Sequence, residues 1–151
     1  MLSENIGYIY VKLGGSFITF KDRPFSVNYV ALDKIVEILH RIDSSKPLIL
    51  GNGGGSFAHT VVKLYEDPLM KIVMCQSSTR RLNNIVVEHL VNNGVKASSI
   101  QTSAIMYELE NGIEVNPTPV KLALMNKFHP VLYGECIFST KTIYRVISTE
   151  E

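Results

Sequence analysis

Three consecutive glycines, Gly53 to Gly55, constrain this chain more than any other part of its sequence. They follow the apolar run Leu48–Leu50 and precede an amphipathic segment. Glycine has no Cβ, so its backbone N–H groups can approach an anion closely and its φ angle can be positive. A strand, then glycines, then a helix N-terminus is an arrangement that cradles phosphate groups. The sequence therefore predicts a site for a phosphorylated small molecule, with His59 about one helical turn beyond the glycines as an additional donor.

Short apolar runs alternate with amphipathic segments along the rest of the chain. The apolar runs predict strands over 6–13, 48–50, 95–105 and 130–133. Helical spacing of apolar residues predicts helices over 27–42, capped by Ser26, and over 56–65, 77–93 and 119–127. Asn111-Gly112 predicts a hairpin over 107–115, residues 136–147 predict a second one, and Asp67-Pro68 reads as a break in the pattern. This alternation is typical of an α/β layer fold with a largely parallel sheet.

Composition places the chain among globular proteins and excludes several function classes. Hydrophobic residues make up 46% and charged residues 19% of the 151 residues, which suits one domain with a substantial core. The net charge of +1 gives no reason to expect a nucleic-acid surface, so any anion binding must be local. No apolar run reaches membrane-spanning length and no signal peptide is indicated, so we expect a cytoplasmic protein. Cys75 and Cys136 lack metal-ligand spacing and are expected to be buried free thiols.

Candidate binding residues follow three of the predicted strands. Glycine-bearing turns come directly after them at Gly14-Gly15, Gly53–Gly55 and Gly134. Because ligands of parallel sheets bind beyond the carboxyl ends of the strands, we expect these turns to face one crevice. Lys12 and Lys21 flank the first turn, and two cations together with backbone N–H groups suit phosphoryl transfer, which depends on positioning and charge stabilisation.

Each of these side chains also has a purely structural interpretation. Lys12 could mark the solvent-exposed end of a strand, Lys21 could be ordinary surface charge, and His59 could be a hydrogen-bonded core histidine. The other histidines, His40, His89 and His129, have no comparable context and are interpreted as structural. A binding role is favoured by the combination of three glycine turns, two lysines and a histidine, rather than by any single residue.

Four motifs are spread over the chain. The first runs from Lys12-Leu-Gly-Gly-Ser16 through Ile18-Thr19 to Lys21, and the second is Gly53-Gly-Gly-Ser-Phe-Ala-His59. The third is Thr79-Arg80 with Leu82-Asn83 and Val86-Val87, and the fourth is Pro130-Val-Leu-Tyr-Gly-Glu135. In sequence and order they resemble motifs of the amino acid kinase superfamily, most closely the archaeal-type isopentenyl phosphate kinases. The combination is specific, although each motif alone would be weak.

The resemblance implies a three-layer α/β/α sandwich and a kinase that uses ATP and Mg²⁺ to convert isopentenyl phosphate to isopentenyl diphosphate in isoprenoid biosynthesis. By resemblance, Lys12, Gly14, Gly15 and Gly55 would hold the ATP phosphates, and Lys21 would stabilise the transition state. Gly54, His59 and Gly134 would bind the substrate phosphate. Residues 1–151 would be the N-terminal, substrate-binding half of such a domain, with the nucleotide-binding half absent. The isolated chain is then expected to be inactive.

Several residues depart from the pattern of the family. Asn52 stands where the family has a histidine, and Ala58 where it has a glycine. Phe20 and Glu135 each stand where an aspartate is usual. The resemblance further implies a pocket for the isoprenoid tail, and the residues proposed to line it are Val27, Val30, Val61 and Met74.

Three functions stay open at this point. The first is the acceptor-binding half of an isopentenyl phosphate kinase, acting with a separate nucleotide-binding half or as a homodimer, because half of a sheet leaves an exposed edge and face. The second is a non-catalytic module that binds a phosphorylated ligand or has a regulatory role. The third is a related kinase for another small phosphate or phosphonate, although His59 favours isopentenyl phosphate over nucleotides. No nucleic-acid or membrane partner is expected.

Overall fold

The computed structural model describes residues 7–42 and 45–151, so Ile6, the first residue of the predicted N-terminal strand, lies outside the described residues. The strands are β1 (Ile9–Leu13), β2 (Leu48–Asn52), β3 (Ala97–Ser99), β4 (Met106–Leu109), β5 (Gly112–Val115), β6 (His129–Tyr133), β7 (Glu135–Phe138) and β8 (Tyr144–Ile147). The helices are α1 (Gly15–Ile18), α2 (Tyr29–Arg41), α3 (Gly55–Leu64), α4 (Pro68–Asn92), α5 (Thr102–Ile105) and α6 (Thr118–Met125). Within these ranges, no helix has the length and apolar character needed to cross a membrane.

A four-stranded sheet in the order β1-β2-β6-β3 forms the centre of the molecule. Its neighbouring strands all run parallel, which confirms the predicted sheet. In the register of this sheet, Leu13 pairs with Asn52, and Asn52 pairs with Tyr133. The last residues of β1, β2 and β6 are therefore neighbours, so the glycine turns that follow them begin at the same end of the sheet.

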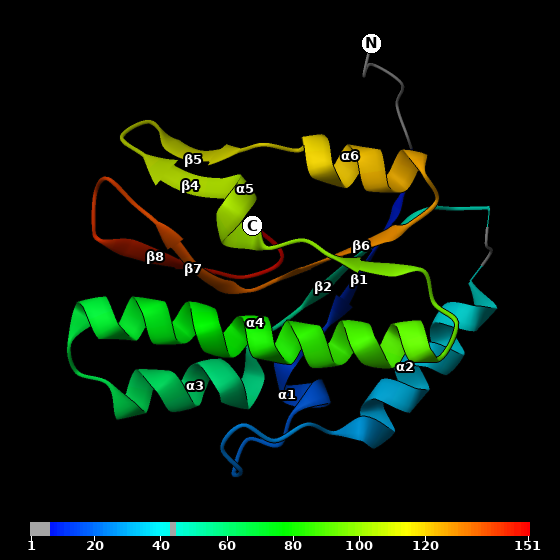
Figure 1. Ribbon diagram of the computed structural model, residues 1–151, viewed down its shortest axis with the longest axis horizontal. Helices are drawn as coiled ribbons and strands as arrows, with labels where there is room; N and C mark the ends of the chain where they lie inside the picture. The colour runs from blue at the N-terminus through cyan, green and yellow to red at the C-terminus, as the bar shows by residue number, and fades with distance from the viewer. Residues whose placement is uncertain (1–6, 43–44) are drawn as a thin grey trace.

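Helices cover both faces of this sheet (Figure 1). The helices α2, α3 and α4 lie on one side, and α6 lies on the other. The buried residues that join the first layer to the sheet include Leu32 and Ile35 of α2, Leu50 and Val131 of the sheet, and Leu82 of α4. Each is at most 5% exposed, and burying such a side chain contributes about 1.5–3 kcal/mol to stability. The arrangement confirms the predicted α/β fold.

The long helix α4 differs from the prediction at its start. Asp67-Pro68 was expected to break the pattern, with a helix only from residue 77, but α4 begins at Pro68 and runs for 25 residues. The Asp67 side chain caps the helix by accepting a hydrogen bond from the Met70 backbone nitrogen at 2.9 Å. Pro68 occupies the first turn, where a missing N–H costs nothing and a fixed φ is favourable. The dipeptide is therefore a helix start.

Two further boundaries also differ from the prediction. The strand expected over 95–105 is limited to β3, because the chain turns at Thr102 into the short helix α5. Thr102 Oγ1 donates to the carbonyl of Tyr133 at 2.7 Å, which fixes this turn against β6. The cap of α2 is Asn28 rather than Ser26, since Asn28 Oδ1 accepts from the Ala31 nitrogen at 3.2 Å. The two predicted hairpins are present as β4–β5 and β7–β8.

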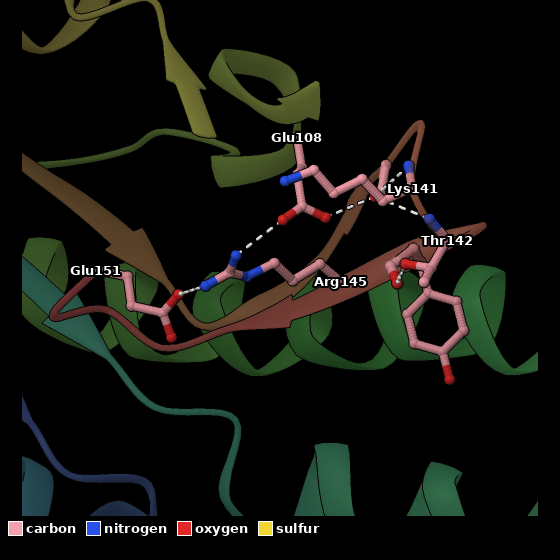
Figure 2. A network of polar contacts seen from close by, with 7 residues as sticks. Glu108, Lys141, Thr142, Arg145 and Glu151 are labelled. Carbon is pink, nitrogen blue, oxygen red and sulfur yellow. Dashed lines mark hydrogen bonds and ion pairs between the residues drawn. The ribbon is translucent and has the colours of Figure 1, made fainter. Parts of the chain in front are cut away.

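A polar network joins these two hairpins (Figure 2). Glu108 of β4 is only 7% exposed, and its carboxylate accepts from Ser139 Oγ at 2.6 Å and from Arg145 Nη1 of β8 at 2.8 Å. The second guanidinium nitrogen of Arg145 donates to Glu151 at 3.1 Å. The hydrogen bonds from Ser139, and next from Arg145, lower the pKa of Glu108. The network thus fixes both hairpins and the C-terminal residues to each other.

We expect Glu108→Gln to destabilise the fold in a pH-dependent way. Because the folded-state pKa of Glu108 is lowered, its contribution to stability is complete above the ordinary glutamate value of about 4.3. That contribution is lost as the pH falls through the folded-state pKa. Urea denaturation at neutral pH and at about pH 3.5 measures the change. The exposed Glu114 of β5 supplies the control Glu114→Gln. An equal loss of stability at both pH values would contradict the role of the Glu108 charge.

Candidate functional site

A cavity of about 420 Å³ lies at the carboxyl ends of β1, β2 and β6. It is lined by seven of the eight residues that have a predicted role in binding or catalysis, namely Lys12, Gly15, Lys21, Gly54, Gly55, His59 and Gly134. Gly14 stands just outside the lining and accepts the first backbone hydrogen bonds of α1, from Phe17 and Ile18. Residues from the three predicted glycine turns therefore meet at one crevice, as expected.

The first two glycine turns are in direct backbone contact. A Cβ placed on Gly15 would lie 2.5 Å from the nitrogen of Gly55, and one on Gly53 would lie 2.7 Å from the nitrogen of Gly15. Gly55 also has a φ of +48°, a conformation that residues with a side chain rarely adopt. These glycines are thus required by the packing of one turn on the other, in addition to any contact with a ligand.

Thr19 connects the same two turns through its hydroxyl group. It is 2% exposed, donates from Oγ1 to the carbonyl of Gly15 at 2.7 Å, and accepts from the backbone nitrogen of Ser56 at 2.9 Å. The start of α3 is thereby anchored to the turn after β1. Thr19 is part of the first motif, but its role was not predicted, because its burial between the two turns depends on a contact with a residue far along the chain.

Lys21 and His59 contribute an ammonium group and an imidazole ring to the lining of the cavity. Lys21 follows α1, and His59 lies on α3, the helix that begins at the glycine run. Both residues are exposed, and in the described part of the chain neither forms a salt bridge. Their polar groups are therefore available to an anion that enters the cavity.

Lys12 differs because its ammonium group already has a partner. It forms an ion pair with Glu150, and the hydrogen bond from Lys12 lowers the pKa of that carboxyl group. The adjacent Thr149 accepts a hydrogen bond from Tyr10 Oη through its backbone carbonyl at 2.7 Å. The C-terminal residues therefore lie along β1 and border the cavity. Sequence reasoning missed Glu150, because nothing in the local pattern indicates a contact with a lysine so distant along the chain.

The inner wall of the cavity contains a buried acid at one of the departures from the family pattern. Glu135 is 1% exposed, and its Oε1 accepts from the backbone nitrogen of Ser103 at 2.6 Å. Its Oε2 has no hydrogen-bond partner among the described residues. Burial raises the pKa of Glu135, and burial also raises the pKa of the neighbouring Tyr133 to about 12. The wall is thus polar at this point without an exposed charge.

Asn52, another departure, has a structural explanation. It is fully buried at the end of β2, and its Oδ1 accepts from Asn83 Nδ2 of α4 at 2.8 Å. Asn83 in turn accepts a hydrogen bond from Ser99 of β3. The pair of amides therefore joins the sheet to α4 directly behind the glycine run.

The expected hydrophobic lining is not part of this cavity. None of Val27, Val30, Val61 and Met74 lines it. Val27 packs against the main core, Val61 and Met74 pack in a small apolar cluster with Cys75 and Cys136, and Val30 is 65% exposed on α2. These side chains pack between elements or face solvent, so the predicted tail pocket is not part of this cavity and stays a prediction.

We expect Glu135→Gln to stabilise the fold at neutral pH. Because the folded-state pKa of Glu135 is raised, its carboxyl group loses its proton at a lower pH in the unfolded chain than in the folded one. The free energy of unfolding therefore falls as the pH rises from about 4.3 through the folded-state pKa. Glutamine keeps the acceptor for Ser103 and removes this pH dependence. Chemical denaturation between about pH 4 and pH 7 measures the difference, with Glu88→Gln on the exposed face of α4 as the control. Equal destabilisation by Glu135→Gln at every pH would show that the buried acid is not protonated preferentially.

Comparison with known proteins identifies the family of the chain. Residues 8–151 match the model of the amino acid kinase family. The chain is similar to an isopentenyl phosphate kinase of Methanocaldococcus jannaschii, with 31% identity over 158 residues that cover 93% of this chain and 60% of the relative. It is also similar to an isopentenyl phosphate kinase of Methanothermobacter thermautotrophicus, with 27% identity over 95% of this chain and 59% of the relative. The chain thus spans about three fifths of the length of these relatives.

A solved structure shows the same arrangement in three dimensions. An X-ray structure of isopentenyl phosphate kinase superposes with a TM-score of 0.83 and 26% identity, over 94% of this chain and 64% of that one. The family match extends over nearly the whole described chain, and the parallel sheet with glycine turns at its carboxyl end agrees with it. The chain belongs to the amino acid kinase family.

Proposed function

We propose that this chain is the acceptor-binding half of an isopentenyl phosphate kinase, an enzyme that transfers phosphate from ATP to isopentenyl phosphate and forms isopentenyl diphosphate. The observation that carries the proposal is that His59, Gly54 and Gly134 line one cavity with Lys12 and Lys21. The similarity to isopentenyl phosphate kinases over more than nine tenths of the chain supports it. Because only three fifths of those relatives are covered, the proposal assigns to residues 1–151 the acceptor site and the turns that would hold the donor phosphates, and no complete kinase activity.

The start of α3 is the proposed site of the acceptor phosphate. Helix α3 begins at Gly55, and Gly54 at its N-cap borders the cavity. The N-terminus of a helix carries a partial positive charge and N–H groups that are not used inside the helix. His59 lies one turn further along and can donate a hydrogen bond to the same anion. Gly134, which directly follows the neighbouring strand β6, completes this side of the cavity.

The proposed donor side is the turn after β1. Lys12, Gly14 and Gly15, with Gly55 opposite, would hold the phosphates of ATP, which supplies the phosphoryl group. The close backbone contact of these glycines fits a chain of phosphates, because no Cβ projects from the two turns there. Lys21 would stabilise the charge of the transferring group.

A Mg²⁺ ion would depend mainly on the nucleotide for its ligands. The described residues contain no group of three or more His, Cys, Asp or Glu side chains able to hold a metal ion. Mg²⁺ bound with nucleotides is usually held by one or two carboxylates and the phosphates themselves. Glu150 is the acid nearest to the donor side, through its ion pair with Lys12.

A nucleotide-binding half is the proposed partner of this chain. A second cavity of about 480 Å³ lies on the sheet beside β1, and its apolar lining is Tyr8, Tyr10, Ile49, Met106 and Leu132. Tyr10 of the edge strand β1 is 39% exposed, and Tyr8, directly before this strand, is 57% exposed. An open apolar face beside a sheet edge marks an interaction surface. The homodimer remains the alternative occupant.

One observation favours a non-catalytic module as the second candidate function. The ion pair with Glu150 neutralises Lys12, the cation proposed for the donor phosphates. A chain in which this pair persists would bind the acceptor phosphate through His59 and α3 without positioning ATP. The two functions differ in whether the chain binds ATP as well as the acceptor.

We expect the chain to bind isopentenyl phosphate, and His59→Ala to weaken that binding by about 10- to 100-fold, because a hydrogen bond to a charged group contributes about 1.5–3 kcal/mol. Isothermal titration calorimetry measures both affinities. His40→Ala is the matched control, since His40 bonds to the carbonyl of Asn93 and lies outside the cavity. Undetectable binding by a correctly folded chain would refute the proposed acceptor site. Unchanged affinity in His59→Ala would remove His59 from it.

We expect Glu150→Gln to strengthen ATP binding by about two- to fivefold, because it releases Lys12 from an exposed ion pair. Calorimetry with ATP at low ionic strength detects the change, which should shrink as salt is added. Glu151→Gln is the control, because Glu151 pairs with Arg145 instead of Lys12. If Glu150→Gln weakens ATP binding, Glu150 positions Lys12 for the donor, contrary to a blocking role.

A further inference from the structure

Cys75 and Cys136 lie side by side although 61 residues separate them in the chain. Cys75 is on α4 and Cys136 is on β7, and their sulfur atoms are 2.7 Å apart. Both are free thiols, 3% and 1% exposed, and they pack with Val61 and Ile72 in a small apolar cluster. The sequence predicted two buried thiols and gave no sign that they were neighbours.

The two thiols are chemically unequal. Cys136 Sγ donates a hydrogen bond to Cys75 Sγ, and this bond lowers the pKa of Cys75 and raises that of Cys136. The nearby carboxyl group of Glu135 acts to raise the pKa of both thiols. Cys75 also borders the cavity that contains His59, whereas Cys136 does not. A small molecule that enters the cavity therefore reaches Cys75 first, the thiol with the greater tendency to ionise.

We propose that Cys75 and Cys136 form a reversible oxidation site that reacts with small hydroperoxides and closes to a disulfide. The Cys75 thiolate attacks one oxygen of the hydroperoxide, the O–O bond breaks, and an alcohol, or water in the case of hydrogen peroxide, leaves with one proton. Cys75 is then a sulfenic acid. The sulfur of Cys136 next attacks that of Cys75, the S–O bond breaks, and water leaves with the hydroxyl group and the Cys136 proton. The two thiols have lost two electrons, and the hydroperoxide has gained them.

The surrounding structure favours ring closure without a large movement of the backbone. Gln76 Nε2 donates to the carbonyl of Cys136 at 2.9 Å, so α4 and β7 are already joined at this point. Thr79 Oγ1, one turn along α4, donates to the carbonyl of Cys75 at 2.8 Å. The disulfide would covalently attach α4 to β7 and remove a thiol from the cavity wall. This reaction requires neither ATP nor the proposed kinase function.

Treatment of the wild-type chain with a small excess of hydrogen peroxide tests the proposal. We expect the number of titratable thiols to fall from two to zero, the mass to fall by two hydrogen atoms, and digestion to yield one peptide pair linked through Cys75 and Cys136. Because the disulfide closes a long loop, the Tm of the oxidised chain should rise by about 5–10 °C and return when a thiol reductant is added. Persistence of both thiols, or disulfides only between molecules, would overturn the proposal.

Serine variants separate the two roles. In Cys136→Ser, Cys75 should stop at the sulfenic acid, which dimedone traps as an adduct on that residue. In Cys75→Ser, the remaining thiol of Cys136 should react at least about 10-fold more slowly with hydrogen peroxide, because Cys136 does not border the cavity through which the peroxide enters. Circular dichroism verifies the fold, and the wild-type mass measurement decides the proposal if a variant does not fold. Equal rates in the two variants would refute the assigned order of attack.

Discussion

The backbone contact between the two glycine turns is the constraint on which the site depends. A Cβ on Gly15 or Gly53 would overlap the backbone of the opposite turn, and one on Gly55 would lie 2.6 Å from the carbonyl oxygen of Gly15. Strand pairing makes the ends of β1 and β2 neighbours, and the contact between the turns holds the start of α3 beside them, so Lys12 and His59 face the same cavity. Separation of the turns would cost the hydrogen bond that the Ser56 backbone nitrogen donates to Thr19 Oγ1.

Anion recognition by this chain must come from the placement of a few charges. The net charge is only +1, so no long-range field concentrates anions at the surface. Lys12, Lys21 and His59 nevertheless line one cavity. Two acidic residues lie beside them, and their surroundings favour different charge states. Glu135 is buried, which favours its neutral form, whereas Glu150 is ionised and paired with Lys12. The positive character of the cavity therefore depends on the state of two specific carboxyl groups.

The sequence predicted those parts of the fold that follow from local pattern. Apolar runs followed by glycine identified β1, β2 and β6, and the ends of parallel strands must share one edge, so the site residues could be assembled before the structure. The start of α4 was missed because Asp-Pro is compatible both with a chain break and with a capped first turn, and only packing distinguishes them. The contacts of Glu150 with Lys12 and of Cys75 with Cys136 join residues far apart in the chain, and no periodicity encodes such pairs.

The C-terminal residues physically connect the proposed acceptor cavity with the open face of the sheet. Ser148 and Thr149 line both the cavity with His59 and the one beside Tyr8 and Tyr10. Glu151 is bound by Arg145, which also binds the buried Glu108 (Figure 2). On its other side, this segment is fixed by the ion pair of Glu150 with Lys12. A protein that covers the open face must contact this segment. A carboxylate or cation that it brought there would compete directly for Lys12 or Glu150. Docking on the sheet would then change the charge at the proposed donor side through a single ion pair.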